Sequence, residues 1–189
     1  MKKGKIILEN EQFELTIERL CHQLIESYDR FENTCIIGVQ PRGVLLAERI
    51  CKRLQTILKI KKIEYGKLDI TFYRDDFRTR SKPLSPSSIE MDFLVENKNV
   101  LLVDDVLYSG RTIQAAMTAL NHYGRPQRVE LVALVDRRFN RHLPIQSDYI
   151  GVTVDAVDEA YVQVQWKESE GKDQIVLYAS KDDRGAKLQ

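Results

Sequence analysis

The stretch "VLLVDDVLYSGRT", Val100–Thr112, runs from four apolar residues into two adjacent aspartates and then into a loop of small residues. The apolar run predicts a buried strand, and the helical spacing of Ile113, Ala116 and Leu120 predicts a helix directly after the loop. Two neighbouring carboxylates repel one another, and burial makes their charges more unfavourable. The arrangement therefore needs a compensating group, which is a metal ion, a set of hydroxyl donors or a basic partner.

The end of this strand and the loop after it predict a site for a ribose phosphate. In open α/β sheets, ligands bind beyond the carboxyl ends of the strands, where Asp104 and Asp105 stand. Neighbouring ribose hydroxyls suit a pair of carboxylates, since each carboxylate oxygen accepts a hydrogen bond. Gly110 permits backbone angles that other residues resist, and Ser109 and Thr112 supply hydroxyls beside the free N–H groups of a helix start. We expect a ribose at the acids and its 5′-phosphate in the loop.

Two common phosphate-binding motifs are excluded by the same residues. No GK[ST] follows a glycine at the spacing of a Walker loop, and G-x-G-x-x-G is absent. An isolated pair of aspartates is more often a helix cap beside a solvated side chain. The whole stretch, rather than the pair of acids, favours a binding site.

The rest of the chain alternates between strand and helix patterns. Helical spacing extends from Asn10, the expected cap, to Tyr28, and a second helical pattern follows the first strand. Buried strands are predicted at Cys35–Val39, Asn99–Val103 and Val129–Val135. Alternation of this kind predicts an α/β fold with a central, mainly parallel sheet flanked by helices.

Two segments depart from this alternation. Residues 74–90 carry charges of both signs and two prolines, which is typical of a long surface loop that covers a binding site. Beyond Tyr149, "YVQVQW" alternates with period two and "IVLYA" follows a charged turn, so we expect a terminal hairpin. The prediction is a single domain over residues 1–189, with a lid at about 74–90 and a small hood at about 136–180.

Composition limits the function classes. The chain has 189 residues, of which 43% are hydrophobic and 30% charged, as in an ordinary globular domain. A net charge of +1 gives no strong overall attraction to nucleic acid or membrane, so an anion site must be local. No apolar run approaches the ~18 residues of a membrane span, and no signal peptide is evident. Cys21, Cys35 and Cys51 are expected to be reduced core thiols of a cytoplasmic protein.

The thirteen-residue stretch resembles the signature of type I phosphoribosyltransferases, which use 5-phosphoribosyl-1-pyrophosphate (PRPP) and Mg²⁺. The segments "GVQPRGVLLAERI", "DITFYRDD", "GRPQRVELVALVDRR" and "LPIQSDYIG" follow in family order, with the signature among them. Together they resemble the PyrR family, whose members are uracil phosphoribosyltransferases and often RNA-binding attenuators of pyrimidine operons. The resemblance covers roughly residues 5–180. It implies a type I phosphoribosyltransferase fold, conversion of uracil and PRPP to UMP and pyrophosphate, and a homodimer or higher homo-oligomer.

The resemblance also implies roles for the residues that match the motifs. The catalytic set is Asp104, Asp105 and Arg42, and the acids hold the ribose hydroxyls and act on the metal only through PRPP and water. "QPRG" matches the pyrophosphate loop, in which Pro41 lowers the cost of a cis peptide bond. Tyr73, Arg74 and Asp75 begin the lid. The PRPP site further comprises Val106, Leu107, Tyr108, Ser109, Gly110, Arg111 and Thr112, and the base site Val135, Asp136, Arg137 and Val162.

Binding to a pyrimidine-operon leader RNA is a second hypothesis. The basic residues that match the family's RNA surface are Arg19, His22, Arg138 and Arg141. Gln146 and Val152 stand where the family pattern is basic, which favours the enzyme over the regulator because phosphate contacts dominate RNA affinity. A transferase for another base and a non-catalytic regulator that senses PRPP or nucleotides stay open as alternatives. No general base for uracil N1 is evident.

Overall fold

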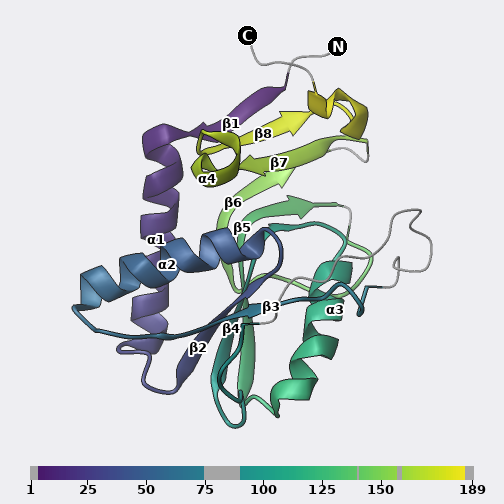
Figure 1. Ribbon diagram of the computed structural model, residues 1–189. Coiled ribbons are helices and arrows are strands. Elements are labelled where there is room, and N and C mark those ends of the chain that lie inside the picture. Colours follow the sequence, from purple (N-terminus) through teal and green to yellow (C-terminus); the bar gives the residue numbers. More distant parts are fainter. Residues whose placement is uncertain (1–3, 75–89, 140, 157–158, 186–189) are drawn as a thin grey trace.

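The computed structural model describes residues 4–74, 90–139, 141–156 and 159–185. Its centre is a five-stranded sheet in the order β3-β2-β4-β5-β6, and every neighbouring pair is parallel. Figure 1 shows this sheet below a smaller one. The prediction of an α/β fold with a parallel sheet is confirmed. Its strands are β2 (Thr34–Val39), β3 (Glu64–Leu68), β4 (Asn99–Leu107), β5 (Arg128–Arg138) and β6 (Tyr149–Asp155).

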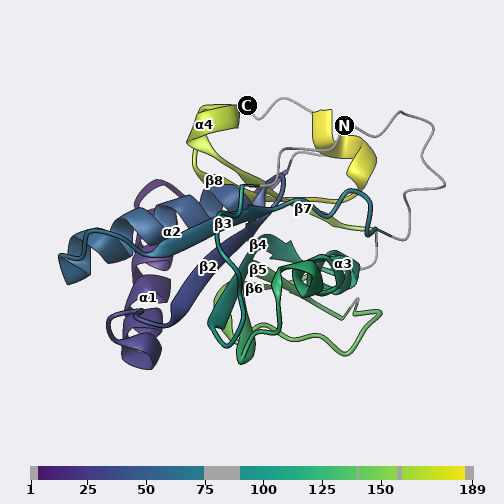
Figure 2. The ribbon, with the colours of Figure 1, turned by 60° about the horizontal axis from the view of Figure 1, so that its bottom comes forward.

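Helices cover both faces of this sheet (Figure 2). α1 (Asn10–Tyr28) and α2 (Gly43–Leu58) lie on one face, and α3 (Arg111–Leu120) with the short 3₁₀ turn Asn121–Tyr123 lies on the other. Successive strand residues alternate between the two faces, so that Leu101 packs toward α1 and α2 and its neighbours pack toward α3. The buried strands are therefore apolar on both faces, as expected for a parallel sheet between helices.

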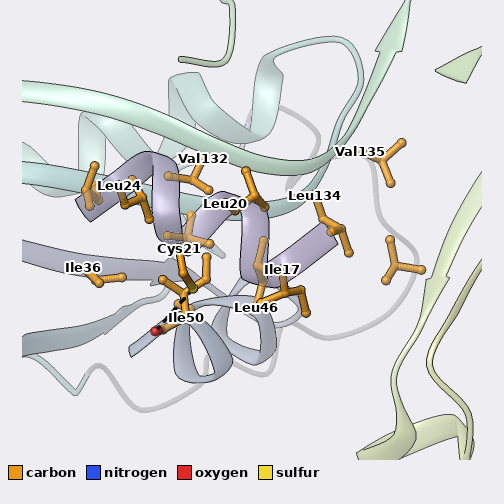
Figure 3. Packing of buried hydrophobic residues seen from close by; sticks show 14 of the residues in the cluster. Ile17, Leu20, Cys21, Leu24, Ile36, Leu46, Ile50, Val132, Leu134 and Val135 are labelled. Carbon is orange, nitrogen blue, oxygen red and sulfur yellow. Dashed lines mark hydrogen bonds between the residues drawn. The ribbon is translucent and has the colours of Figure 1, made fainter. Parts of the chain in front are cut away.

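The core on the α1 side is built from apolar side chains three and four residues apart on the helices, facing those of the strands. Figure 3 shows this packing. Burial of such side chains stabilises the fold by about 1.5–3 kcal/mol each. The residues seen together are Ile17, Leu20, Leu24, Leu46, Ile50, Val132 and Leu134.

A second, antiparallel sheet forms a hood over one end of the main sheet. It has the order β1-β8-β7, where β1 is Lys5–Glu9, β7 is Tyr161–Gln165 and β8 is Gln174–Tyr178. The predicted terminal hairpin is thus confirmed as β7 and β8, with the four-residue helix α4 (Lys167–Glu170) in its turn. Pairing of β1 with β8 was not predicted. The hood residue Trp166 is fully buried and meets Phe13 of α1 edge-on, at 5.4 Å between ring centroids.

The predicted boundaries need three corrections. β4 continues through Leu107, because its pairing with β5 persists past the acids. β6 pairs with β5 in the main sheet, so the part of the expected hood range, about 136–180, that contains β6 does not belong to the hood. Asn10 is the first helical residue with φ +50°, and the cap position is Glu9, which makes no side-chain capping bond.

The three cysteines are free and buried, as the sequence predicted. Burial raises the pKa of Cys21, Cys35 and Cys51 to about 12, so each thiol stays protonated at neutral pH. Among the described residues, no helix has the length and apolar character of a membrane span.

Candidate active site

The two acids lie near the carboxyl end of the strand β4, and both are buried. Asp104 is 7% exposed and Asp105 is 8% exposed, and the Asp105 main-chain N–H donates to Asp104 Oδ1 at 2.9 Å. Burial raises the pKa of Asp104 well above its ordinary value, and the charge of Asp105 raises it further. Burial also raises the pKa of Asp105, although Arg42 opposes this shift. Two buried carboxylates side by side repel one another, and a hydroxyl donor or a cation bound beside them reduces that repulsion.

Asp104→Asn is expected to stabilise the free protein by about 1–2 kcal/mol, because it removes a buried charge while keeping the oxygen that accepts from Asp105 N–H. A raised folded-state pKa gives stability at low pH that is lost as the pH rises through it. The advantage of the asparagine variant should therefore grow from pH 5 to pH 8. Thermal unfolding of both proteins across that pH range measures the difference in stability. A variant that is less stable than the wild type at pH 8 would contradict the claim that the buried charge of Asp104 destabilises the free protein.

The loop after the acids has the geometry of an anion cradle. Gly110 adopts φ +91° immediately before α3, a left-handed conformation that favours glycine. The Ser109 carbonyl accepts the N–H groups of His142 (3.0 Å) and Leu143 (3.2 Å), while Arg141 donates to the Tyr108 carbonyl. The segment that follows β5 thus holds the loop from outside, and the loop leads directly into the start of α3, the end of a helix that favours anions.

The loop between β2 and α2 brings a guanidinium to the acids. Its Gln40–Pro41 peptide bond is cis, the isomer that the resemblance to the family's pyrophosphate loop allows at Pro41. Arg42 Nε donates to Asp105 Oδ2 at 2.9 Å, Nη1 donates to Glu170 Oε1 at 3.1 Å, and Nη2 donates to the Val164 carbonyl. Burial disfavours the charged guanidinium, but the pairing with Asp105 and Glu170 outweighs burial and raises the pKa of Arg42.

Arg42, Asp105 and part of the loop after the acids meet at one cavity between the main sheet and the hood, whereas Asp104 is not among its lining residues. Its volume is about 430 Å³, which is within the range of small-molecule sites. Eight of the predicted site residues line it, together with hood residues that the sequence did not single out. The predicted residues are Arg42, Arg74, Asp105, Val106, Tyr108, Thr112, Arg137 and Val162; the others are Glu159, Ala160, Tyr161, Gln163, Val164 and Lys181.

Comparison with known proteins identifies the chain. The family model of the phosphoribosyl transferase domain matches residues 3–169. "Bifunctional protein PyrR" of Haemophilus ducreyi is 42% identical over 176 residues, spanning 93% of this chain and 97% of that protein. The protein of the same name from Bacillus cereus is 37% identical over 182 residues, 94% of this chain and 99% of that one. This chain belongs to the PyrR family of phosphoribosyltransferases.

Solved structures place the PyrR-family fold among type I phosphoribosyltransferases. A hypoxanthine phosphoribosyltransferase from Staphylococcus aureus superposes with a TM-score of 0.68 at 18% identity, over 94% of this chain and 93% of that one. The corresponding enzyme of Trypanosoma cruzi gives a TM-score of 0.66 at 17% identity, over 93% and 96% of the two chains. At such identity the likeness concerns the fold alone.

The predicted residues outside the cavity lining have other surroundings. Leu107 is buried in the core on the α3 side, and Val135 is buried in the core on the α1 side. Tyr73 packs near His122, at 5.6 Å between ring centroids. Asp75 and most of the lid lie outside the described residues.

Asp136 and Arg137 point in different directions, because neighbours on a strand face opposite sides. The Asp136 carboxylate accepts from Arg141 and borders a second, open hollow. Arg137 is 4% exposed and places its guanidinium 4.1 Å from the centre of the Tyr108 ring, on the cavity side. Of the residues predicted for the base, Arg137 and Val162 therefore line the cavity, whereas the side chains of Val135 and Asp136 do not.

The three candidate RNA arginines of this PyrR-family protein lie near the edge strand β6. Arg19 donates to the carbonyls of Ile150 and Gly151, and Arg138 holds Asp155 through two bonds of 2.7 Å. Ile150 also borders the open hollow that Arg138 and Arg141 line. His22 lies one turn beyond Arg19 on α1, with Glu18 3.8 Å away. Each of the three arginines already has an acceptor within the chain, with which an RNA phosphate would compete.

Proposed function

We propose that this PyrR-family protein is a uracil phosphoribosyltransferase that converts uracil and PRPP to UMP and pyrophosphate. The observation that carries the proposal is the convergence of Arg42, Asp105 and the loop Val106–Thr112 on one cavity under the hood. PRPP offers the matching groups, which are a pyrophosphate, a pair of ribose hydroxyls and a 5′-phosphate. The PyrR relatives, at about 40% identity over most of the chain, support the same activity.

The proposed binding mode assigns one group of PRPP to each part of the site. The ribose hydroxyls donate to Asp104 and Asp105, which relieves the repulsion between these carboxylates. The 5′-phosphate lies against the start of α3, where the main-chain N–H groups of the first turn and the helix dipole favour an anion. The pyrophosphate lies at the loop that contains Arg42, whose planar guanidinium suits paired phosphate oxygens. Three fixed points hold the anomeric carbon C1 in one position for attack.

The donor set suits Mg²⁺ without a dedicated protein cage. Mg²⁺ prefers carboxylate, phosphate and hydroxyl oxygens and keeps several of its waters, and the buried acids offer negative charge beside the positions proposed for the pyrophosphate and the ribose. When bound, Mg²⁺ neutralises charge on the pyrophosphate leaving group. The protein's own contribution is to orient the sugar and to place Asp104 and Asp105 beneath the positive charge that develops at C1.

We place uracil on the hood side of the cavity, between the Arg137–Tyr108 pair and Val162. This region combines flat apolar surface with main-chain groups of β7, a combination suited to a small planar base with two carbonyl acceptors and an N–H donor between them. Arg74 and Lys181 also line the cavity and add positive charge that suits a polyanion such as PRPP. No covalent intermediate is needed, because positioning and charge stabilisation account for the chemistry.

Product formation from PRPP and Mg²⁺ with uracil, orotate, hypoxanthine or adenine tests the proposal. Uracil is expected to give UMP and the other bases little product, as measured by chromatography of the nucleotides. Preferred use of another base would establish a transferase of different specificity. Binding of PRPP without turnover of any base would establish a non-catalytic regulator instead.

A second activity, binding to a pyrimidine-operon leader RNA, is favoured by the gathering of basic side chains along β6 and by the bifunctional designation of the relatives. Because Arg19, Arg138 and Arg141 are engaged within the chain, we expect weak binding that falls steeply with salt. A gel-shift titration against leader RNA at 50 and 200 mM salt measures it. Equal binding of an unrelated RNA of the same length would exclude specific recognition.

A further inference from the structure

Each guanidinium nitrogen of Arg42, which we assign to the pyrophosphate, has a hydrogen-bond partner within the chain. Its three donor nitrogens bond to Asp105 of β4, to Glu170 of α4 and to the Val164 carbonyl of β7. Two of these acceptors belong to the hood and one to the main sheet. A guanidinium has five N–H groups in a fixed planar fork, and each of its three nitrogens already carries one of these bonds. A phosphate group that takes two N–H groups must therefore share the guanidinium with these partners or displace one of them.

Glu170 is the partner most easily displaced. The Val164 carbonyl is fixed in β7, and Asp105 is buried in β4, whereas the Glu170 side chain is 25% exposed at the end of a four-residue helix. The Glu170 carboxylate also accepts the Trp166 main-chain N–H at 2.9 Å and the Ser169 hydroxyl, which keep it beside Arg42. Burial raises the pKa of Glu170, but these hydrogen bonds and Arg42 outweigh burial and lower it, so the group is ionised at neutral pH.

We propose that Glu170 is a positioning residue that holds Arg42 in the free enzyme and competes with the pyrophosphate group for it, thereby weakening PRPP binding and speeding pyrophosphate release. The inference rests on the proposed function, since it concerns the anion that Arg42 would bind. Two effects act in the same direction. Glu170 occupies Nη1 of Arg42, and its negative charge repels a polyanion that approaches the same guanidinium. Neither effect changes the acids that act on C1.

Removal of this charge should tighten anion binding. Glu170→Gln keeps the oxygen that accepts from Trp166 N–H but loses the ion pair. It is expected to lower both the KM for PRPP and the dissociation constant of inorganic pyrophosphate about two- to fivefold, as for loss of one partly exposed ion pair. Glu170→Asp keeps the charge and should stay near the wild type. Glu170→Ala supplies a second uncharged variant in case the glutamine folds poorly.

Glu168→Gln is the matched control on the same short helix. The Glu168 carboxylate bonds to Arg49 rather than to Arg42, so its loss should leave PRPP and pyrophosphate binding unchanged. Calorimetric titration with magnesium pyrophosphate and steady-state kinetics with uracil give the two measurements.

The outcomes separate the inference from the proposed function. Tighter binding in both uncharged Glu170 variants, with the aspartate and Glu168→Gln near the wild type, supports competition. Unchanged or weaker pyrophosphate binding in the uncharged variants would overturn it, because Glu170 would then be neutral or would assist Arg42. A wild-type protein that binds neither PRPP nor pyrophosphate would refute the proposed function itself, and the inference with it.

Discussion

Asp105→Asn should lower the rate of UMP formation about 100-fold, the scale expected for loss of one preorganised electrostatic contact to the reacting centre. Asp105 lies in the cavity at the end of β4, with its Oδ2 2.9 Å from Arg42 Nε. The substitution keeps the size and shape of the side chain. It removes the negative charge under C1, an acceptor for a ribose hydroxyl and the partner that fixes Arg42 from the main sheet.

The rate is measured with saturating PRPP and uracil, so that weaker binding does not hide the chemical step. Asp29→Asn is the matched control, because it makes the same chemical change at the carboxyl end of α1, where φ is +49°. The control should keep the wild-type rate. An Asp105→Asn protein with nearly full turnover would refute the role given to the acid pair.

Gly43→Ala should raise the KM for PRPP at least about tenfold and lower the free energy of unfolding by about 1–3 kcal/mol, the usual range for overpacking a close contact. A Cβ atom at Gly43 would overlap the Val103 carbonyl oxygen and lie 3.0 Å from Asp104 Cα. Both obstacles are backbone atoms, which cannot rotate away. The start of α2 must therefore move from β4, and Arg42 moves with it.

Kinetics and thermal unfolding of the same preparation separate the two effects of Gly43→Ala. Thr56→Ala serves as control, since Thr56 is an exposed residue of α2 whose hydroxyl donates within the helix to the Lys52 carbonyl. It should leave the KM unchanged. A Gly43→Ala protein with wild-type KM and unfolding temperature would show that the close approach of α2 to β4 does not shape the site.

The parts of the site that follow one another along the chain were predictable. The acids, the left-handed Gly110 and the helix after it form one contiguous stretch, and local chemistry determines each of them. The cis bond at Pro41 could also be expected, since proline lowers the cost of that isomer. In both places the local preference of the residues agrees with the final fold.

The parts that depend on distant pairing were missed. β1 has no alternating pattern in "KIILE", and its place in the hood comes only from its partner β8 at the other end of the chain. Glu170 lies in a charged turn that resembles an ordinary solvated segment, and only the folded hood brings it to Arg42. The opposite directions of Asp136 and Arg137 follow from the length of β5, which the sequence pattern underestimated.

A crystal structure of the protein with PRPP and Mg²⁺ tests the central claim most directly. We predict density for the ribose hydroxyls at Asp104 and Asp105, for the 5′-phosphate against residues 106–112, and for the pyrophosphate at Arg42. PRPP bound at another surface, with the cavity under the hood empty, would contradict the account.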